Sequence, residues 1–115
     1  MAYWGNKADE CDYAFDTLGS YVAHARDSMF HAAEGTITEK YPEQTILVTL
    51  KAIRVLWGAF PKNIACTFHR GDLDKSKRLF NEWLDAAGPK LPKARRIALL
   101  AEAQSIFEAC EDMYR

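Results

Sequence analysis

The chain has 115 residues, of which 49% are hydrophobic and 27% are charged, and its formal net charge is −1. This composition is typical of one soluble globular domain over residues 1–115, and it excludes a disordered chain. The length excludes a second substrate domain or a full dinucleotide-binding fold. The longest apolar stretch, residues 46–60, contains Lys51 and Arg54, so we expect no membrane span.

Helical periodicity is the dominant pattern along the chain. Pro42 and Pro92 open periodic stretches, and Gly35 and Gly88 follow the ends of others, which is the usual placement of these residues around helices. The apolar spacing predicts helices over residues 8–33, 42–59, 72–87 and 92–113. We therefore expect an all-α, single-domain bundle of about four helices with short loops, most simply an up-down bundle or a close variant. The alternative is an irregular α-domain in which one helix packs across the others.

Each expected helix has an apolar face that predicts the core. The faces include Tyr21, Val22 and Met29; Ile46, Leu50, Ile53 and Trp57; Leu73, Phe80 and Trp83; and Leu100, Ala103, Phe107 and Cys110. The second helix has the widest face and should be the most buried. Asp72 is expected to cap the third helix. Residues 62–70, rich in β-branched and aromatic residues, are expected to form an ordered loop or a short extended segment.

The charges are unevenly distributed along the chain. Residues 1–46 hold three basic and eight acidic residues, residues 47–96 hold eleven and four, and residues 97–115 hold one and four. The net charges of these blocks are −5, +7 and −3. We expect a polarised surface, which either steers a charged partner or is neutralised by contacts between the blocks.

Basic residues gather near the starts of the third and fourth expected helices, where positive charge opposes the helix dipole. A chain that tolerates this arrangement twice is a candidate for binding phosphate or an acidic protein surface. The alternative is a solvated polar face that also meets the acidic first helix. The predicted binding patch for a protein or a nucleic acid comprises Lys75, Lys77, Arg78, Lys90, Lys93, Arg95 and Arg96.

An acidic face is expected on the first helix, because Asp9, Asp12 and Asp16 follow one another at steps of four residues or fewer. Such a row can bind a divalent cation or supply an acid–base pair. The simpler interpretation is stabilisation of the helix dipole. Since the helical di-metal motif Glu-x-x-His is missing, we expect neither a metal nor a cofactor.

The thiol and imidazole residues carry a third hypothesis. Cys66 and His69 form a C-x₂-H pair, which a zinc site or an activated nucleophile would require as a minimum. Cys11 and Cys110 are distant in the sequence, and no C-x-x-C occurs. An odd number of cysteines without an apolar leader predicts reduced, buried thiols and a cytoplasmic location. His24 and His31 are expected on an exposed helix face.

The opening residues Met1-Ala2-Tyr3-Trp4-Gly5, with Asp12 and Asp16 beyond them, resemble the start of an uncharacterised family of small bacterial domains. Members of that family open with Met-Gly-x-Trp-Gly and carry a helix with an Asp-x-x-x-Asp pattern. This chain has Ala at the second position, and the likeness covers about sixteen residues. The resemblance implies an intracellular protein of bacterial or phage origin, in which Trp4 and Gly5 belong to the fold.

Three hypotheses for the function follow from these patterns. The first is a small, non-catalytic, intracellular module that binds another protein through its polarised surface, as inhibitors and immunity-type proteins of bacteria and phages do. The second is a nucleic-acid-binding protein that uses the basic residues between 75 and 96. The third is a metal-binding protein or enzyme centred on Cys66 and His69. No membrane partner is expected, and self-association is left open.

Overall fold

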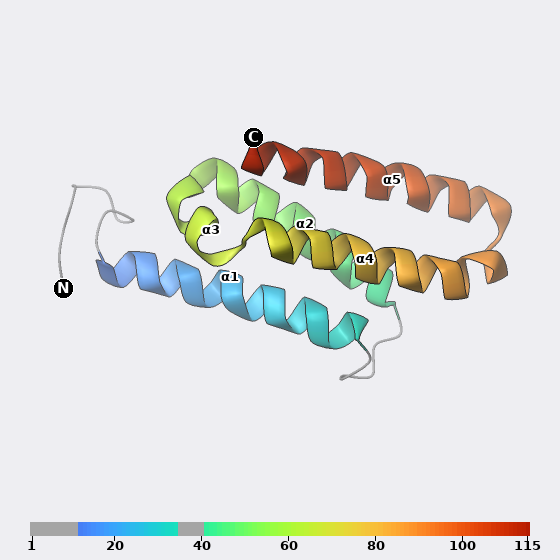
Figure 1. The fold of residues 1–115 in the computed structure, drawn as a ribbon, viewed down its shortest axis with the longest axis horizontal. Coiled ribbons are helices and arrows are strands. Elements are labelled where there is room, and N and C mark those ends of the chain that lie inside the picture. Colours follow the sequence, from blue (N-terminus) through green and yellow to red (C-terminus); the bar gives the residue numbers. More distant parts are fainter. Residues whose placement is uncertain (1–11, 35–40) are drawn as a thin grey trace.

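Five α-helices and two 3₁₀ turns form the part of the chain described by the computed structural model, residues 12–34 and 41–115, and this part contains no strand. The elements are α1 (Asp12–Ala33), α2 (Pro42–Ala59), α3 (Pro61–Thr67), α4 (Arg70–Ala87), η1 (Gly88–Lys90), α5 (Lys93–Glu111) and η2 (Asp112–Tyr114). Figure 1 shows the four long helices running in alternating directions along the molecule, with α3 at one end. The predicted all-α, up-down bundle is therefore confirmed.

The short helix α3 corrects the expectation of a loop or extended segment over residues 62–70. Pro61 stands in the first turn of α3, where its missing N–H group costs no hydrogen bond. Asn63 is buried, and its Nδ2 donates a hydrogen bond of 2.7 Å to the carbonyl oxygen of Phe15 in α1. Packing against α1 and α2 thus overrides the local preference of these residues for extended structure.

The start of α4 differs from the prediction by two residues. The helix begins at Arg70, and Asp72, which was expected to be its N-cap, is the third helical residue. There its Oδ2 accepts a hydrogen bond of 2.9 Å from the backbone N–H of His69. Asp72 therefore stabilises the helix start from inside the first turn, as the acidic residue of a capping box does.

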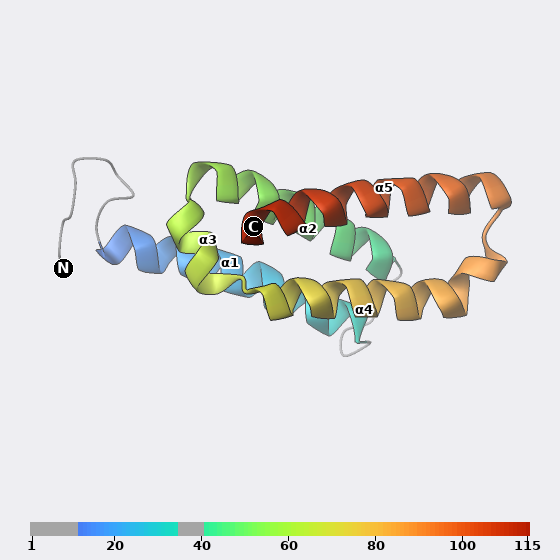
Figure 2. The ribbon, with the colours of Figure 1, turned by 45° about the horizontal axis from the view of Figure 1, so that its top comes forward.

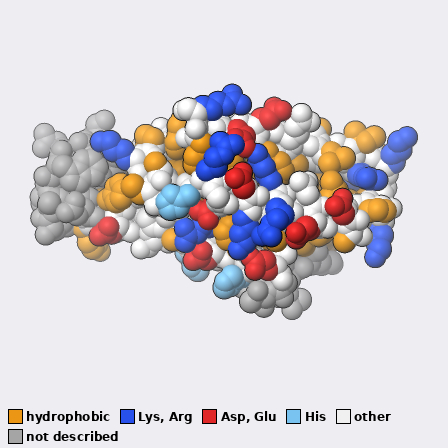
Figure 3. All heavy atoms as spheres, viewed as in Figure 1, with side chains coloured by type: hydrophobic (Ala, Val, Ile, Leu, Met, Phe, Trp, Pro, Cys, Tyr) orange, Lys and Arg blue, Asp and Glu red, His pale blue; other side chains and the backbone are white. Residues whose placement is uncertain are grey.

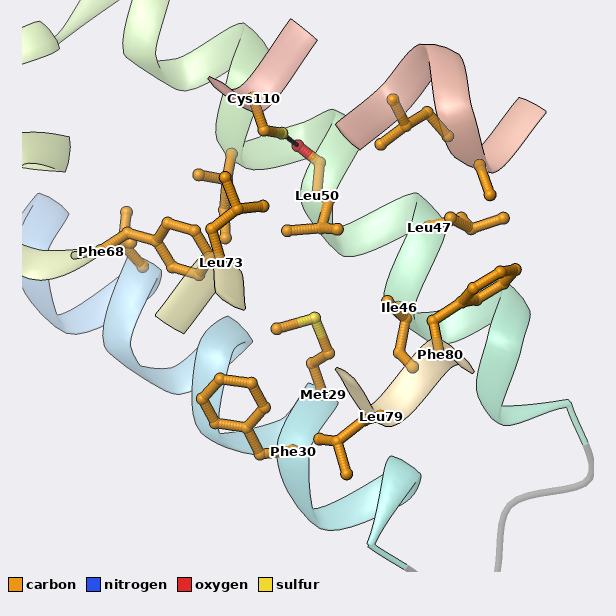
Figure 4. Packing of buried hydrophobic residues seen from close by; sticks show 14 of the residues in the cluster. Met29, Phe30, Ile46, Leu47, Leu50, Phe68, Leu73, Leu79, Phe80 and Cys110 are labelled. Atoms are coloured by element: carbon orange, nitrogen blue, oxygen red, sulfur yellow. Dashed lines mark hydrogen bonds between the residues drawn. The ribbon is translucent and has the colours of Figure 1, made fainter. Parts of the chain in front are cut away.

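The helix α2 is the centre of the core, as its wide apolar face predicts. It contacts α1, α3, α4 and α5, and Ile46, Leu47, Leu50 and Ile53 are almost fully buried. Figure 4 shows side chains from several helices converging on these residues. The remaining core residues are Val22, Met29, Phe30, Ile64, Phe68, Leu73, Leu79, Phe80, Leu99, Ala103, Ile106 and Cys110.

Some residues of the predicted apolar faces lie outside this core. Tyr21 is 67% exposed and Leu100 is 40% exposed, while Trp57 and Trp83 are half-buried against the core. In α5 the core face passes through Leu99 and Ile106 as well as Ala103 and Cys110. The prediction failed for α5 because this helix is apolar on more than one face, so that periodicity alone does not identify the buried one.

Replacement of Phe68 by Ala is expected to lower the free energy of unfolding by about 3–5 kcal/mol, because the ring is fully buried between the helices. Urea denaturation followed by circular dichroism measures this change. The replacement Tyr21→Ala serves as the control, since this exposed ring should contribute within about 0.5 kcal/mol. Equal losses in the two variants would contradict the central position of Phe68.

Candidate functional site

The predicted basic patch divides into two groups along α4 and α5. Near the start of α4, Lys75 Nζ lies 2.7 Å from a carboxylate oxygen of Glu34 and 4.4 Å from the centre of the Phe30 ring. Lys77 is paired with Glu111 of α5. In this region basic and acidic side chains alternate on the surface, as Figure 3 shows for the middle of the molecule. The charges of Lys75 and Lys77 are therefore largely neutralised within the fold.

The second group surrounds the turn between α4 and α5, and we call it the basic end: Lys90, Lys93, Arg95 and Arg96. All four residues are exposed, and none of them forms an ion pair with another residue in the described ranges. Figure 3 shows basic side chains projecting from this end of the molecule. The first turn of α5 contains no acidic residue, so the positive end of the helix dipole adds to the basic charge. Arg78 is exposed but lies in the middle of α4.

The predicted acidic face is described only in part. Asp16 is exposed on α1, Asp12 begins this helix, and Asp9 lies outside the described residues. The acidic and basic blocks nevertheless meet at other positions. Besides the pair of Glu34 with Lys75, Arg26 Nη1 of α1 lies 3.9 Å from Asp72 Oδ2 of α4. The pair of Glu34 with Lys75 thus partly neutralises the two blocks, whereas the pair of Arg26 with Asp72 joins a base of the acidic block to an acid of the basic block.

Glu111 joins the C-terminal part of α5 to the first two turns of α4. Its carboxylate accepts hydrogen bonds from Lys77 and, at 2.7 Å, from Arg70 Nη2. The hydrogen bond from Lys77, together with the positive charges of Lys77 and Arg70, holds the pKa of the Glu111 carboxyl below its ordinary value. The folded state therefore gains stability from the ionised form of Glu111.

The residues Cys66 and His69 are not brought together into a reactive pair. Cys66 is exposed near the end of α3, whereas the His69 backbone caps α4 and its Nδ1 lies 3.8 Å from Asp72 Oδ2. A small pocket of about 170 Å³ has His69 and Arg70 among its lining residues but not Cys66. Within the described ranges, no three His, Cys, Asp or Glu side chains are arranged to hold a metal ion. His24 and His31 are exposed, as expected.

The remaining cysteines differ in their surroundings. Cys110 is fully buried, as expected, and its thiol donates a long hydrogen bond of 3.7 Å to the carbonyl oxygen of Leu50 (Figure 4). Burial raises the pKa of the Cys110 thiol to about 11. The expectation of a buried thiol at Cys66 was wrong, because α3 presents this residue to solvent. Cys11 lies outside the described residues.

An apolar groove between α4 and α5 was missed in the sequence. It has a volume of about 520 Å³, and Phe80, Leu100, Ala103 and Phe107 supply its apolar surface. The rings of Phe80 and Phe107 meet edge to face with their centroids 5.6 Å apart. The available signal was the surplus of apolar residues on α5, which exceeds what one core face requires.

In comparisons with protein-family models, curated proteins and solved structures, the chain matches none of them. The resemblance of the opening residues to a bacterial domain family therefore stays a prediction, and residues 1–11 lie outside the described part of the chain. Among the helices described, none combines the length and the apolar content needed to cross a bilayer.

The ion pairs of Glu111 predict a pH-dependent stability. Because the pKa of this carboxyl is lowered in the folded state, its contribution is present above the ordinary pKa of 4.5 and is lost as the pH falls below it. The free energies of unfolding of the wild type and Glu111→Gln should therefore differ most at neutral pH and converge towards pH 3. Urea titrations at several pH values measure this difference, and a constant difference would contradict the stabilising role of the pairs.

The two described cysteines should react differently with iodoacetamide at pH 8. Cys66 is expected to be alkylated in the native protein because it is exposed. Cys110 should remain unmodified, since the raised pKa leaves little thiolate and the core excludes the reagent. Peptide mass spectrometry identifies the modified residues, and a sample unfolded in guanidinium chloride is the control in which both react. Equal rates in the native protein would contradict the packing of Cys110.

Proposed function

We propose that this protein is a non-catalytic binding module that captures an acidic surface of another protein through its basic end. The observation that carries the proposal is the difference between the two groups of bases. Lys75 and Lys77 have acidic partners within the fold, whereas Lys90, Lys93, Arg95 and Arg96 form no ion pair among the residues described. The proposal places the protein in the cytoplasm, in keeping with its unpaired cysteines.

The basic end is electrostatically unfavourable in the isolated protein. Three of its residues stand in the first turn of α5, where each positive charge opposes the helix dipole by about 0.3–1 kcal/mol. An acidic partner surface would remove this repulsion and would also be attracted over a distance of about 8–10 Å at physiological ionic strength. A charge cluster that costs stability in the free protein and gains favourable contacts in a complex is typical of a recognition site.

The other hypotheses have less support. Lys90, Lys93, Arg95 and Arg96 gather at one end rather than along a continuous stripe, and the chain as a whole is slightly acidic, which does not favour a nucleic-acid-binding surface. The hypothesis of a metal-binding protein or enzyme needs convergent ligands or an activated thiol. Cys66 and His69 provide neither in the arrangement described above.

The proposal is tested by reversing the charges of Lys93, Arg95 and Arg96 to Glu. Tagged wild-type protein is used to capture its partner from a lysate of the source cells, with and without nuclease, and the captured partner is then purified and titrated. The triple variant should bind that partner at least about 100-fold more weakly, because three favourable charge contacts become repulsive. The helical circular dichroism spectrum should remain unchanged, since these side chains are exposed.

The matched control reverses three exposed bases elsewhere, in the variant Lys51→Glu, Lys62→Glu and Arg115→Glu. It changes the net charge by the same amount but leaves the basic end intact, so it should retain most of the affinity. Equal binding by the triple variant and the wild type would reject the basic end as the interface. Loss of the partner on nuclease treatment would favour nucleic acid instead.

A further inference from the structure

The helix α5 has a second apolar face in addition to the one that it contributes to the core. The core face comprises Leu99, Ala103, Ile106 and Cys110. On the side towards α4, Leu100 is 40% exposed and Phe107 is half-buried. A helix that is apolar over two faces is suited to packing against two neighbours at once. In the described part of the chain, only the first of these faces is fully covered.

This second face forms one wall of the groove between α4 and α5. Figure 2 shows these two helices joined at the turn and running in opposite directions, with part of α2 visible between and behind them. Phe80 of α4 and Phe107 of α5 lie in the groove, which also contacts the polar side chains of Asn81 and Gln104. The groove therefore combines an apolar centre with hydrogen-bonding groups at its sides, as is common at sites that bind other proteins.

The charges at the two ends of the groove differ. At one end, Lys77 and Arg70 are paired with Glu111, and Glu108 also lines the groove there, so the formal charges of this end cancel. Towards the other end, Lys93 and Arg96 precede Leu100 by seven and four residues, and these helical spacings place them on the same side of α5. Both belong to the basic end. The groove thus leads from a neutral end, across an apolar centre, to a positively charged end.

We propose that this groove binds an amphipathic α-helix of the partner protein, with apolar side chains over Leu100 and Phe107 and acidic residues over Lys93 and Arg96. This inference rests on the proposed function and specifies the structural element that is recognised. The charge at one end and the apolar centre together define the chemistry of the occupant. Its acidic residues must be confined to one end, because at the other end Glu111 and Glu108 already balance the charges of Lys77 and Arg70.

A helix suits this groove better than an extended segment does. A helix satisfies its own backbone hydrogen bonds, whereas an extended peptide would leave N–H and C=O groups unpaired over the apolar centre. The groove residues of α5, from Leu100 to Glu111, extend over about 17 Å at 1.5 Å per residue, and Lys93 lies about 10 Å beyond Leu100 along the helix. A partner helix of about five turns would therefore contact both the groove and the basic end. Packing between two helices also allows a third helix to contact both at the usual spacing.

The inference is tested with two synthetic peptides labelled with fluorescein. The first has three glutamates followed by leucines at every third or fourth residue, so that a helix presents one apolar stripe and one acidic end. The second has the same composition, but its leucines occupy every second residue and form no helical stripe. Fluorescence anisotropy should show that wild-type protein binds the striped peptide at least about tenfold more tightly, and that added salt weakens this binding.

Substitutions in the protein identify the site of binding. Leu100→Gln should weaken binding of the striped peptide about tenfold, because Leu100 lines the groove, and its partial exposure makes the substitution compatible with folding. Val55→Gln is the matched control, because Val55 is 74% exposed on α2 and does not line the groove. Lys93→Glu with Arg96→Glu should weaken binding and remove most of its salt dependence. Equal affinity for the two peptides, or equal effects of Leu100→Gln and Val55→Gln, would overturn the inference.

The same variants separate this inference from the proposed function. If Leu100→Gln captures the natural partner as well as the wild type does, while reversal of the basic end prevents capture, the groove is rejected and the basic end is retained. If the Leu100→Gln variant and the variant with the reversed basic end both fail to capture the partner, the groove and the basic end are both supported as binding sites. Sedimentation of the wild type supplies a further outcome. A dimer that Leu100→Gln dissociates would show that the groove is occupied by a second copy of the chain and would overturn the inference.

Discussion

The packing of α4 and α5 onto α2, rather than closely onto each other, is the constraint from which the other features follow. The almost fully buried face of Ile46, Leu47, Leu50 and Ile53 provides the surface on which both helices rest. Because α4 and α5 both pack against α2, they need not contact each other along their whole lengths. Their separation leaves Phe107 half-buried in the wall of a groove, where its ring meets the buried ring of Phe80.

The same arrangement explains which charges are neutralised. Glu111 lies where the C-terminal part of α5 passes the first turns of α4, and there it accepts hydrogen bonds from both Arg70 and Lys77. Lys75 reaches across to Glu34 after the end of α1. At the opposite end, the turn between α4 and α5 extends beyond α1 and α2 (Figure 1). Basic residues at that turn are therefore remote from the acidic residues of the other described helices.

The sequence predicted the bounds of a helix well where several local signals agreed. The helix over residues 42–59 was predicted with its observed bounds, because a wide apolar face, an opening proline and a following proline all agreed. In residues 62–70 the local residue preferences indicated a loop, but the burial of Asn63 and Phe68 against other helices determines the conformation. That burial depends on contacts between residues that are distant in the sequence, so no local sequence pattern predicts it.

The candidate site was predictable only in its composition. The sequence places the seven bases in one segment, but which of them have acidic partners depends on Glu34 and Glu111, which lie outside that segment. Similarly, the apolar residues of α5 were recognised, but Leu100 and Phe107 were assigned to the core. Apolar residues at steps of three and four predict an apolar stripe along a helix. Whether that stripe faces the core depends on where the neighbouring helices lie.

The hydrogen bond from the hydroxyl group of Tyr114 to the carbonyl oxygen of Phe68, 2.8 Å long, joins the beginning and the end of the segment that contains α4 and α5. The two helices are thus tied at the base by this bond and by the Glu111 pairs, whereas no ion pair among the described residues joins them at the tip. Local opening of a helical hairpin requires least energy where tertiary contacts are fewest. Amide protons near the tip should consequently exchange with solvent sooner than those near the base, so that the width of the groove can adjust from its charged end.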